Sequence, residues 1–278
     1  MVSKDSDFLY HYTSIDTLAL ILKNKKLRFN NLLDVDDLDE GIRRDKPWGK
    51  YCFVSCWTDF SEESIPMWSM YSRDMKGVRI KLKKLPFVYH EYTGNTTDND
   101  GNIKEHNKRM KAISTEEAVF NRTHMLVTPF LDHLLHPIQY LTDDEIKIKR
   151  SINISVDLSE DQVGPQLRAT TGQLGKYKSI HWSFQREWRY ILVFYPKLNS
   201  GAVSPRDFFV PFRDALNGLY DLPFTDYYLM IHEDAFCSME ITFGPKAGEA
   251  EKILVESLVE KYNPSAIIKD SVLTGRVQ

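Results

Sequence analysis

Three stretches of the sequence place a polar or ionisable side chain among aromatic residues at the end of an expected strand. They are Tyr10–Ser14 (YHYTS), Gly49–Ser55 (GKYCFVS) with the helix that follows it, and Trp182–Arg189 (WSFQREWR). A histidine can accept or donate a hydrogen bond and move a proton near neutral pH. A carboxylate can act as an acid, a base or an anionic partner, and a tyrosine offers both a ring and a hydroxyl. The candidate functional side chains are therefore His11, Tyr71 and Glu187.

Each of these candidates also has a structural interpretation. His11 can be a buried histidine whose hydrogen bonds are satisfied, and Tyr71 can be an aromatic residue of the core. Glu187 can be one half of an ion pair with Arg186 or Arg189, which stand close to it in the sequence. The joint occurrence of the three candidates, in this order and each at the end of an element, favours the functional interpretation.

The remaining patterns that could carry chemistry are weaker. The sequence has no GxGxxG, GxxxxGK[ST], HExxH or GxSxG motif. The acidic stretch Asp34–Glu40 (DVDDLDE) does not fit the glycine and glutamate positions of an EF-hand loop, so we expect a solvated loop. Cys56 has apolar neighbours, which argues against a reactive thiol.

A metal site is a further alternative, and with it a metal-dependent nuclease. Besides the acidic stretch, it would use His124, Asp132, His133 and His136. We favour incidental histidines on a helix surface for this group, because no second pair of ligands is evident.

Local patterns indicate the elements that must position the candidate residues. Alternating or β-prone runs predict strands over residues 8–13, 51–57, 78–82, 187–195, 239–243 and 267–273. Capping residues and apolar periodicity predict a helix from Ser14 or Asp16 onwards, with Ile15, Leu18, Ile21 and Leu22 on its apolar face. A second helix starts at Ser61 or Ser64 and carries Tyr71. A third covers 247–262, with Ile253, Leu254 and Leu258 on its apolar side.

These elements predict one mixed α+β domain over residues 1–278 with a mostly antiparallel sheet. Strands and helices do not alternate regularly, which argues against a doubly wound parallel sheet. Residues 90–175 differ from the rest, because a polar stretch over 93–111 leads into a helical pattern over 112–135. We interpret 90–175 as a helical insertion or lid within the domain.

The composition is that of a globular chain and excludes several classes of protein. Of 278 residues, 36 are Lys or Arg and 39 are Asp or Glu, and the net charge of −3 excludes a generically basic nucleic-acid coat. A small local nucleic-acid site remains open. No apolar run reaches the roughly 20 residues of a membrane span, the first residues do not form a secretory signal, and three cysteines cannot form a disulfide framework. We therefore expect a cytoplasmic protein that does not contact a membrane.

Several pieces of the sequence resemble a bacterial family of unknown function, domain of unknown function 2971 (DUF2971). They are YHYTSIDTLALILKNKKL, FVSCWTDFSEESIPMWSMYSRDMKGVRI, WSFQREWRYIL and the closing GP…DSVLTGR. The resemblance spans nearly the whole chain apart from the expected insertion. An Asn-Asp-Pro-x-Glu-like turn of that family corresponds to Asp36–Glu40, which keeps the second acid and the Glu but not the Asn or the Pro.

A more distant resemblance supplies an activity. A first-strand His beside a small hydroxyl residue, a Gly-x-Tyr-x-Phe-like strand before an aromatic-bearing helix, and a Glu that opens a late strand resemble ADP-ribosyltransferases of the His–Tyr–Glu type. GKYCFVS resembles the GIYF strand of that superfamily, and EWRYIL resembles its EYIVY-like strand. The matching positions are His11, Tyr71 and Glu187. The resemblance implies an ADP-ribosyltransferase-like fold with a split sheet, and NAD as the substrate.

The resemblance also implies a role for each residue. Cleavage of the glycosidic bond between nicotinamide and ribose passes through an oxocarbenium-like state. Glu187 would hold the ribose 2′-hydroxyl, stabilise the positive charge and polarise the incoming nucleophile. Tyr71 would stack on nicotinamide, and His11 would hydrogen-bond the ribose on the adenosine side. The further NAD-binding candidates are Tyr12, then Thr13, Ser55 and Ser69 for the carboxamide, and Arg28 and Arg189 for the diphosphate.

Two functions from different classes follow. The first is an NAD-consuming ADP-ribosyltransferase, a toxin or defence effector that modifies a protein or a nucleic acid and that a neutralising partner would hold in check. In this case Glu187→Gln should abolish turnover with little loss of folding, because Glu187 is expected in a cleft rather than in the core. The second is a non-catalytic nucleotide-binding or sensor module on the same fold, which binds NAD or another nucleotide without releasing nicotinamide.

Overall fold

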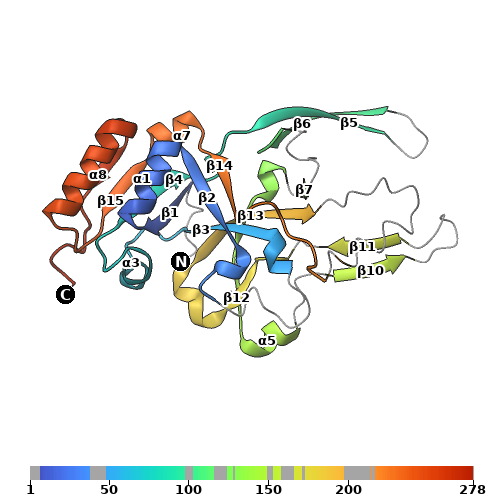
Figure 1. Cartoon of the computed structure of the whole chain (residues 1–278), viewed down its shortest axis with the longest axis horizontal. Coiled ribbons are helices and arrows are strands. Elements are labelled where there is room, and N and C mark those ends of the chain that lie inside the picture. Colours follow the sequence, from blue (N-terminus) through green and yellow to red (C-terminus); the bar gives the residue numbers. More distant parts are fainter. Residues whose placement is uncertain are drawn as a thin grey trace.

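A large, mostly antiparallel β-sheet forms the centre of the protein (Figure 1). The computed structural model describes residues 7–37, 48–97, 103–115, 124–127, 129–148, 153–157, 166–170, 173–196, 214 and 217–277. Within these residues the strands are β1 (Phe8–Thr13), β2 (Lys26–Asn31), β3 (Cys52–Thr58), β4 (Val78–Lys83), β5 (His90–Thr97), β6 (Ile103–Ala112), β7 (His124–Leu126), β8 (Leu135–Pro137), β9 (Gln139–Leu141), β10 (Asn153–Asp157), β11 (Gln166–Thr170), β12 (Tyr177–Ser179), β13 (Glu187–Pro196), β14 (Asp226–Met230), β15 (Glu240–Phe243) and β16 (Ile267–Lys269). The helices are α1 (Ile15–Asn24), α3 (Ile65–Tyr71), α5 (Asp143–Ile148), α7 (Glu233–Cys237) and α8 (Glu249–Tyr262), and the 3-10 helices are η1 (Leu32–Asp34), η2 (Trp48–Tyr51), η3 (Leu131–His133) and η4 (Ile180–Gln185). None of the described helices has the length and apolar character that crossing a bilayer requires.

The strands of the central sheet follow a spatial order that differs from their order in the sequence. Hydrogen-bonded neighbours run β14-β2-β3-β1-β4-β15-β16, while β13 also pairs with β3 and carries β7 and β8 on its far side. Neighbouring strands of this sheet are antiparallel, except that β15 and β16 are parallel. The prediction of a mixed α+β domain with a mostly antiparallel sheet is confirmed.

The sheet forks at β3. β13 pairs with one edge of β3 along its whole length, residues 52–58. The other edge is shared, because β2 pairs with it at residues 53–54 and β1 pairs with it at Thr58. Between these two points residues 55–57 have no strand partner on that edge among the pairings described, so β1 and β2 diverge there.

Helix α1 joins β1 to β2 and therefore connects the two arms of the fork. Ser14 caps its start, since the hydroxyl of Ser14 accepts a hydrogen bond from the backbone N–H of Thr17 at 3.2 Å. The buried face of the helix is the one predicted from the sequence, formed by Leu18, Ile21 and Leu22. Local capping and periodicity thus suffice to build this element correctly.

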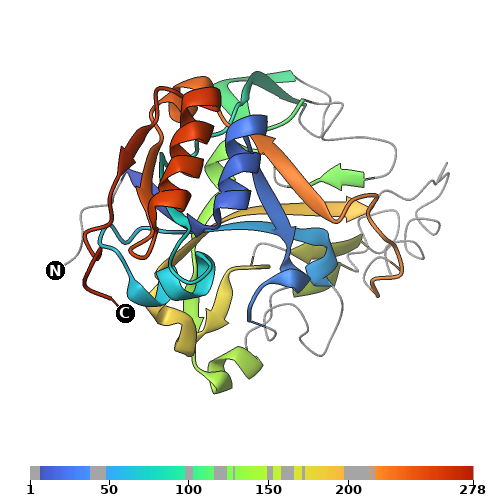
Figure 2. The same cartoon turned by 60° about the vertical axis from the view of Figure 1, so that its left-hand side comes forward.

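Helix α8 lies beside α1 (Figure 2), and its buried side differs from the prediction. Val255 and Val259 are buried, whereas Ile253 and Leu254 are 54% and 55% exposed. These apolar residues all fall within two turns of one helix, so their periodicity leaves the rotation of the helix open. Packing selects the stripe of Val255 and Val259, with Leu258 partly buried against the core. The predicted apolar side is therefore wrong for Ile253 and Leu254 and right for Leu258.

The helical character predicted for the insertion over 90–175 is also wrong. The described part of this segment is mostly strand: β5 and β6 form a hairpin that projects from the body (Figure 1), and β7 and β8 add to β13. Glu91 lies opposite Lys111 in the hairpin, and a cross-strand pair of opposite charge favours strand pairing that a helical periodicity does not reveal. Residues 116–123 of the expected helix lie outside the described residues, and the limits of the insertion stay a prediction.

Helix α3 carries Tyr71 and is followed by a strained turn. Residues 73–75 have φ values of 43°, 57° and 64°, a left-handed conformation that costs L-residues roughly 1–2 kcal/mol each. Gly244 packs against this turn, and a Cβ atom at position 244 would lie 2.2 Å from the carbonyl oxygen of Met75. The backbone N–H of Gly244 also donates to the carbonyl of Gly77 at 2.8 Å. Close backbone packing therefore holds the turn, and with it the end of α3.

Candidate functional site

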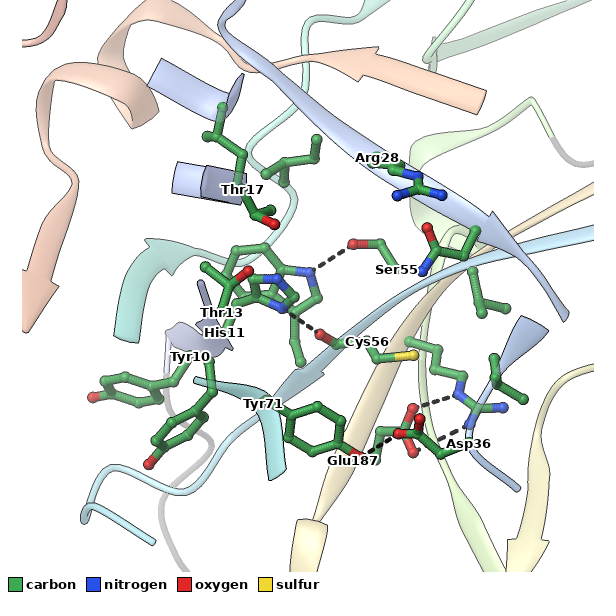
Figure 3. Close-up of a pocket in the computed structure, with 18 of the residues that line it drawn as sticks. Tyr10, His11, Thr13, Thr17, Arg28, Asp36, Ser55, Cys56, Tyr71 and Glu187 are labelled. Atoms are coloured by element: carbon green, nitrogen blue, oxygen red, sulfur yellow. Dashed lines mark hydrogen bonds and ion pairs between the residues drawn. The ribbon is translucent and has the colours of Figure 1, made fainter. Parts of the chain in front are cut away.

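A pocket of about 600 Å³ opens in the fork between β1 and β2 (Figure 3). Its walls come from β1 and α1, from β2 and the acidic residues after it, from the middle of β3, and from α3, β12, η4 and β13. The volume falls in the range of roughly 300–1,000 Å³ that small-molecule and cofactor sites occupy. Because the walls combine aromatic, aliphatic, hydroxyl and charged side chains, the pocket suits a ligand with planar and polar parts.

The pocket brings together the residues that the sequence analysis predicted for the site. They come from β1, β3, α3 and β13, and they are His11, Tyr12, Thr13, Ser55, Tyr71, Glu187 and Arg189. Arg28 also lines the pocket, whereas Ser69 is not among its lining residues. The position of these side chains in one pocket is a finding, and their roles in binding or catalysis stay predictions.

His11 fills the gap that the fork leaves on the edge of β3. Its Nδ1 lies 2.8 Å from the carbonyl oxygen of Cys56, and its ring lies 5.1 Å from the ring of Trp57. Burial lowers the pKa of His11, which favours the neutral ring. Because a carbonyl oxygen only accepts hydrogen bonds, the proton of the neutral ring is on Nδ1, and Nε2 is left as an acceptor.

Glu187 opens β13 and is only 5% exposed. Arg189 Nε donates to Oε1 of Glu187 at 2.5 Å, and Lys178 Nζ donates to Oε2 at 2.9 Å. Burial raises the pKa of Glu187, but the charges of Arg189 and Lys178 outweigh it and lower the pKa to about 2. The ion pair with Arg189 is therefore confirmed, while Arg186 pairs with Asp59 at 3.0 Å instead. The expectation that Glu187 lies in a cleft rather than in the core is corrected, because it lines the pocket from within a buried ion cluster.

A chain of hydrogen bonds connects Glu187 to the hydroxyl of Tyr71. Lys178 Nζ donates to Oε1 of Gln185 at 2.8 Å as well as to Glu187, and Gln185 Nε2 donates to the hydroxyl of Tyr71 at 2.7 Å. Lys178 can only donate, which fixes the orientation of the Gln185 amide. The hydroxyl of Tyr71 in turn donates to Oδ2 of Asp36 at 2.7 Å. Burial and the bonded Asp36 raise the pKa of Tyr71, so the phenol stays neutral.

The start of the acidic stretch belongs to this site, which corrects the expectation of a solvated loop. Asp36 is exposed in the pocket wall, whereas Asp37 is buried and its Oδ2 accepts a hydrogen bond from the backbone N–H of Ser179 at 3.3 Å. Residues 38–40 lie outside the described part of the chain. Sequence reasoning missed three members of the network, namely Asp36, Lys178 and Gln185. The available signal was the correspondence of Asp36 to the first position of the family's turn.

The surroundings of Cys56 and His124, two further candidates, indicate structural roles. Burial, together with the nearby charge of Glu187, raises the pKa of the Cys56 thiol well above its usual range, which agrees with the prediction of an unreactive thiol. His124 packs edge-on against Phe194 and Phe224, with ring centroids 5.4 and 5.0 Å away. In the part of the chain that the structure describes, no three His, Cys, Asp or Glu side chains are arranged to hold a metal ion.

The low pKa of Glu187 predicts that acid weakens the fold. An unperturbed glutamate has a pKa of about 4.3, and in the folded protein the value is about 2, so the folded state binds fewer protons between these values. The contribution of Glu187 is therefore present above about pH 4.3 and is lost as the pH falls towards 2. This difference in pKa corresponds to on the order of 3 kcal/mol.

The measurement is urea unfolding of the wild type and of Glu187→Gln at pH values between about 6 and 3. We expect the difference in free energy of unfolding between the two proteins to shrink as the pH falls, because protonation makes the wild-type side chain resemble the amide. A difference that stays constant across this range contradicts the low pKa.

The fold and the pocket define a mixed α+β protein with a cavity of small-molecule size at the fork of its sheet. Residues 67–190 match a family model described as "Protein of unknown function (DUF2971)". The match runs from α3 into β13, so it includes Tyr71 and Glu187, while His11 and Asp36 lie before it. No curated protein and no solved structure matches the chain. The match supports the resemblance to this family, whose description states no activity.

Proposed function

We propose that this pocket binds NAD and that the protein is an ADP-ribosyltransferase that modifies a macromolecule. The observation that carries the proposal is that His11, Tyr71 and Glu187 line one pocket, although His11 and Glu187 are more than a hundred residues apart in the sequence. Each is also the residue that matches the His–Tyr–Glu pattern. The fork between β1 and β2 agrees with the split sheet that this resemblance implies.

The residues around the pocket suit the chemistry of NAD. In the proposed reaction the bond between ribose C1′ and the pyridinium nitrogen breaks, and its electron pair leaves with neutral nicotinamide. C1′ then bonds to an oxygen or nitrogen of the acceptor, which gives up a proton. Nε2 of His11 is available to accept a hydrogen bond from a ribose hydroxyl, and the ring of Tyr71 offers a face for stacking. Carboxylates in the wall can stabilise the positive charge that develops on the ribose.

A non-catalytic nucleotide-binding module is the second candidate, and one observation favours it. Both carboxylate oxygens of Glu187 are engaged, by Arg189 and by Lys178, and the charge of Glu187 is thereby offset. A catalytic glutamate at this position would have to act from within that ion cluster. If no other carboxylate meets the ligand, NAD would be bound without being cleaved.

The test combines two measurements. NAD binding by the purified protein is measured by calorimetry, and nicotinamide release is measured with and without cell lysate as a source of acceptor. We expect the wild type to bind NAD and to release nicotinamide, and His11→Ala to weaken NAD binding by about tenfold, the contribution of one hydrogen bond. His133→Ala is the matched control, because His133 is exposed and does not line the pocket. Binding without release under every condition supports the nucleotide-binding module. A folded wild type that neither binds NAD nor releases nicotinamide contradicts the transferase and also contradicts a module whose ligand is NAD.

A further inference from the structure

We infer that Asp36, rather than Glu187, is the carboxylate that contacts the ligand in this pocket, and that Tyr71 holds Asp36 in place. The inference rests on the proposed function, since it takes NAD as the ligand. It assigns a residue that the resemblance to ADP-ribosyltransferases does not supply, because the His–Tyr–Glu pattern places the acid on the late strand.

The hydrogen bonds of Glu187 argue against direct contact with a ligand. Arg189 binds both oxygens, at 2.5 and 3.2 Å, and Lys178 binds one of them at 2.9 Å. The side chains of these two cations are 0% and 4% exposed, so the cluster is shielded from water. A ligand hydroxyl would have to displace a buried charge-assisted hydrogen bond to reach the carboxylate, which is costly.

The surroundings of Asp36 differ from those of Glu187 in exposure and in charge. It is exposed, it lines the pocket, and among the described residues it forms no ion pair. Its Oδ2 accepts the hydrogen bond from Tyr71 at 2.7 Å, and Figure 3 shows the two side chains meeting beside Glu187. A carboxylate has room for further hydrogen bonds beyond this one. Asp36 can therefore accept a hydroxyl of the ligand while Tyr71 fixes its position.

The direction of the hydrogen bonds explains how Tyr71 positions Asp36. Gln185 donates its amide hydrogen to the phenol oxygen, so the phenol's own hydrogen points to Asp36. Gln185 is 3% exposed and is held in turn by Lys178. The buried ion cluster therefore serves as a rigid anchor. One chain of hydrogen bonds runs from it through Gln185 and Tyr71 to the exposed carboxylate of Asp36.

The charges also indicate which part of NAD lies at Asp36. The cationic pyridinium ring and the ribose next to it are attracted by an exposed carboxylate, whereas the cations beside Glu187 disfavour a positive ring there. We therefore place the nicotinamide–ribose half of NAD against Asp36 and Tyr71. Asp36 would accept a ribose hydroxyl and stabilise the charge that develops on the ribose.

The experiment compares NAD binding and nicotinamide release for the wild type, Asp36→Asn, Tyr71→Phe, the double variant and Glu187→Gln, each first shown to be folded by circular dichroism. Asp132→Asn is the control, since it removes one exposed carboxylate that does not line the pocket. We expect Asp36→Asn to lower the rate of release about a hundredfold or more with an unchanged unfolding midpoint. Tyr71→Phe keeps the ring, and its effect should not add to that of Asp36→Asn if Tyr71 acts through Asp36.

The outcomes separate this inference from the proposed function. Wild-type rates in Asp36→Asn, with loss of release in folded Glu187→Gln, overturn the inference and leave the transferase in place with Glu187 as its acid. Fully additive effects of Asp36→Asn and Tyr71→Phe overturn the positioning role of Tyr71. Absence of both NAD binding and release in the folded wild type overturns the proposed function, and the assignment of Asp36 with it.

Discussion

Replacing Glu187 with glutamine is expected to lower the free energy of unfolding by about 3–5 kcal/mol. The substitution removes the negative charge and leaves Arg189 and Lys178 buried without it. An amide cannot offset two cations, so the cost is that of uncompensated charge in the core rather than of a lost surface contact. The measurement is urea unfolding at neutral pH, followed by circular dichroism.

A control variant shows whether burial is the cause. Glu240 also binds two lysines, Lys81 and Lys269, but these partners are 22% and 53% exposed. Glu240→Gln should therefore cost about 1 kcal/mol or less. Equal losses in the two variants, or a loss below about 1 kcal/mol in Glu187→Gln, contradict the buried ion cluster. Because Glu187→Gln is expected to be less stable, a loss of activity in this variant has to be distinguished from a loss of folding.

Gly77→Ala is expected to destabilise the protein by about 3 kcal/mol or more, because the added methyl group has no space. A Cβ atom at position 77 would lie 2.2 Å from the carbonyl oxygen of Thr13 and 2.9 Å from the Cβ of Ser72. The nearest atom belongs to the backbone of β1, which cannot move without disturbing the pairing of Thr13 with Val78 on β4. Since Thr13 lines the pocket, the proposed binding of NAD should weaken in the same variant.

Gly248→Ala is the matched comparison for this substitution. Its added methyl group would meet only Oε2 of Glu251, at 3.1 Å, and this is the end of a flexible side chain. We expect a change within about 1 kcal/mol for Gly248→Ala. The measurement is thermal unfolding of both variants and of the wild type. Equal stability of Gly77→Ala and Gly248→Ala contradicts the close approach of position 77 to β1.

Elements with a complete local signal could be predicted from the sequence. The cap at Ser14 and the apolar stripe after it define α1, and the long β-prone run from Glu187 defines β13. Elements that depend on a distant partner could not be predicted. Strands β7 and β8 have three residues each and exist because they pair with β13, and the rotation of α8 is decided by what it packs against.

The same distinction applies to the site. His11, Tyr71 and Glu187 stand out locally because each is a functional residue type among aromatics at the end of an element. Gln185 stands in the same stretch as Glu187, but a neutral amide is a weaker chemical signal, and Lys178 lies outside the three stretches. The importance of both comes from contacts with Tyr71 and Glu187 across the fold. The ion pair of Glu187 with Arg189 could be proposed from the sequence, because the two residues are close on one expected strand. Its burial and the second pair, with Lys178, could not, because they depend on which side of β13 is covered.

The pairing of β3 with the distant strand β13 has a consequence for the order of events during synthesis. Thr58 on β3 pairs with Glu187 on β13, so about 130 residues must be added before that edge of β3 is covered. At a translation rate of roughly 5–20 residues per second this takes on the order of ten seconds. Until then the nascent chain carries β1, α1, β2 and β3 without the ion cluster. The pocket is therefore completed late in synthesis, and a long-range contact of this kind also slows refolding of the released chain.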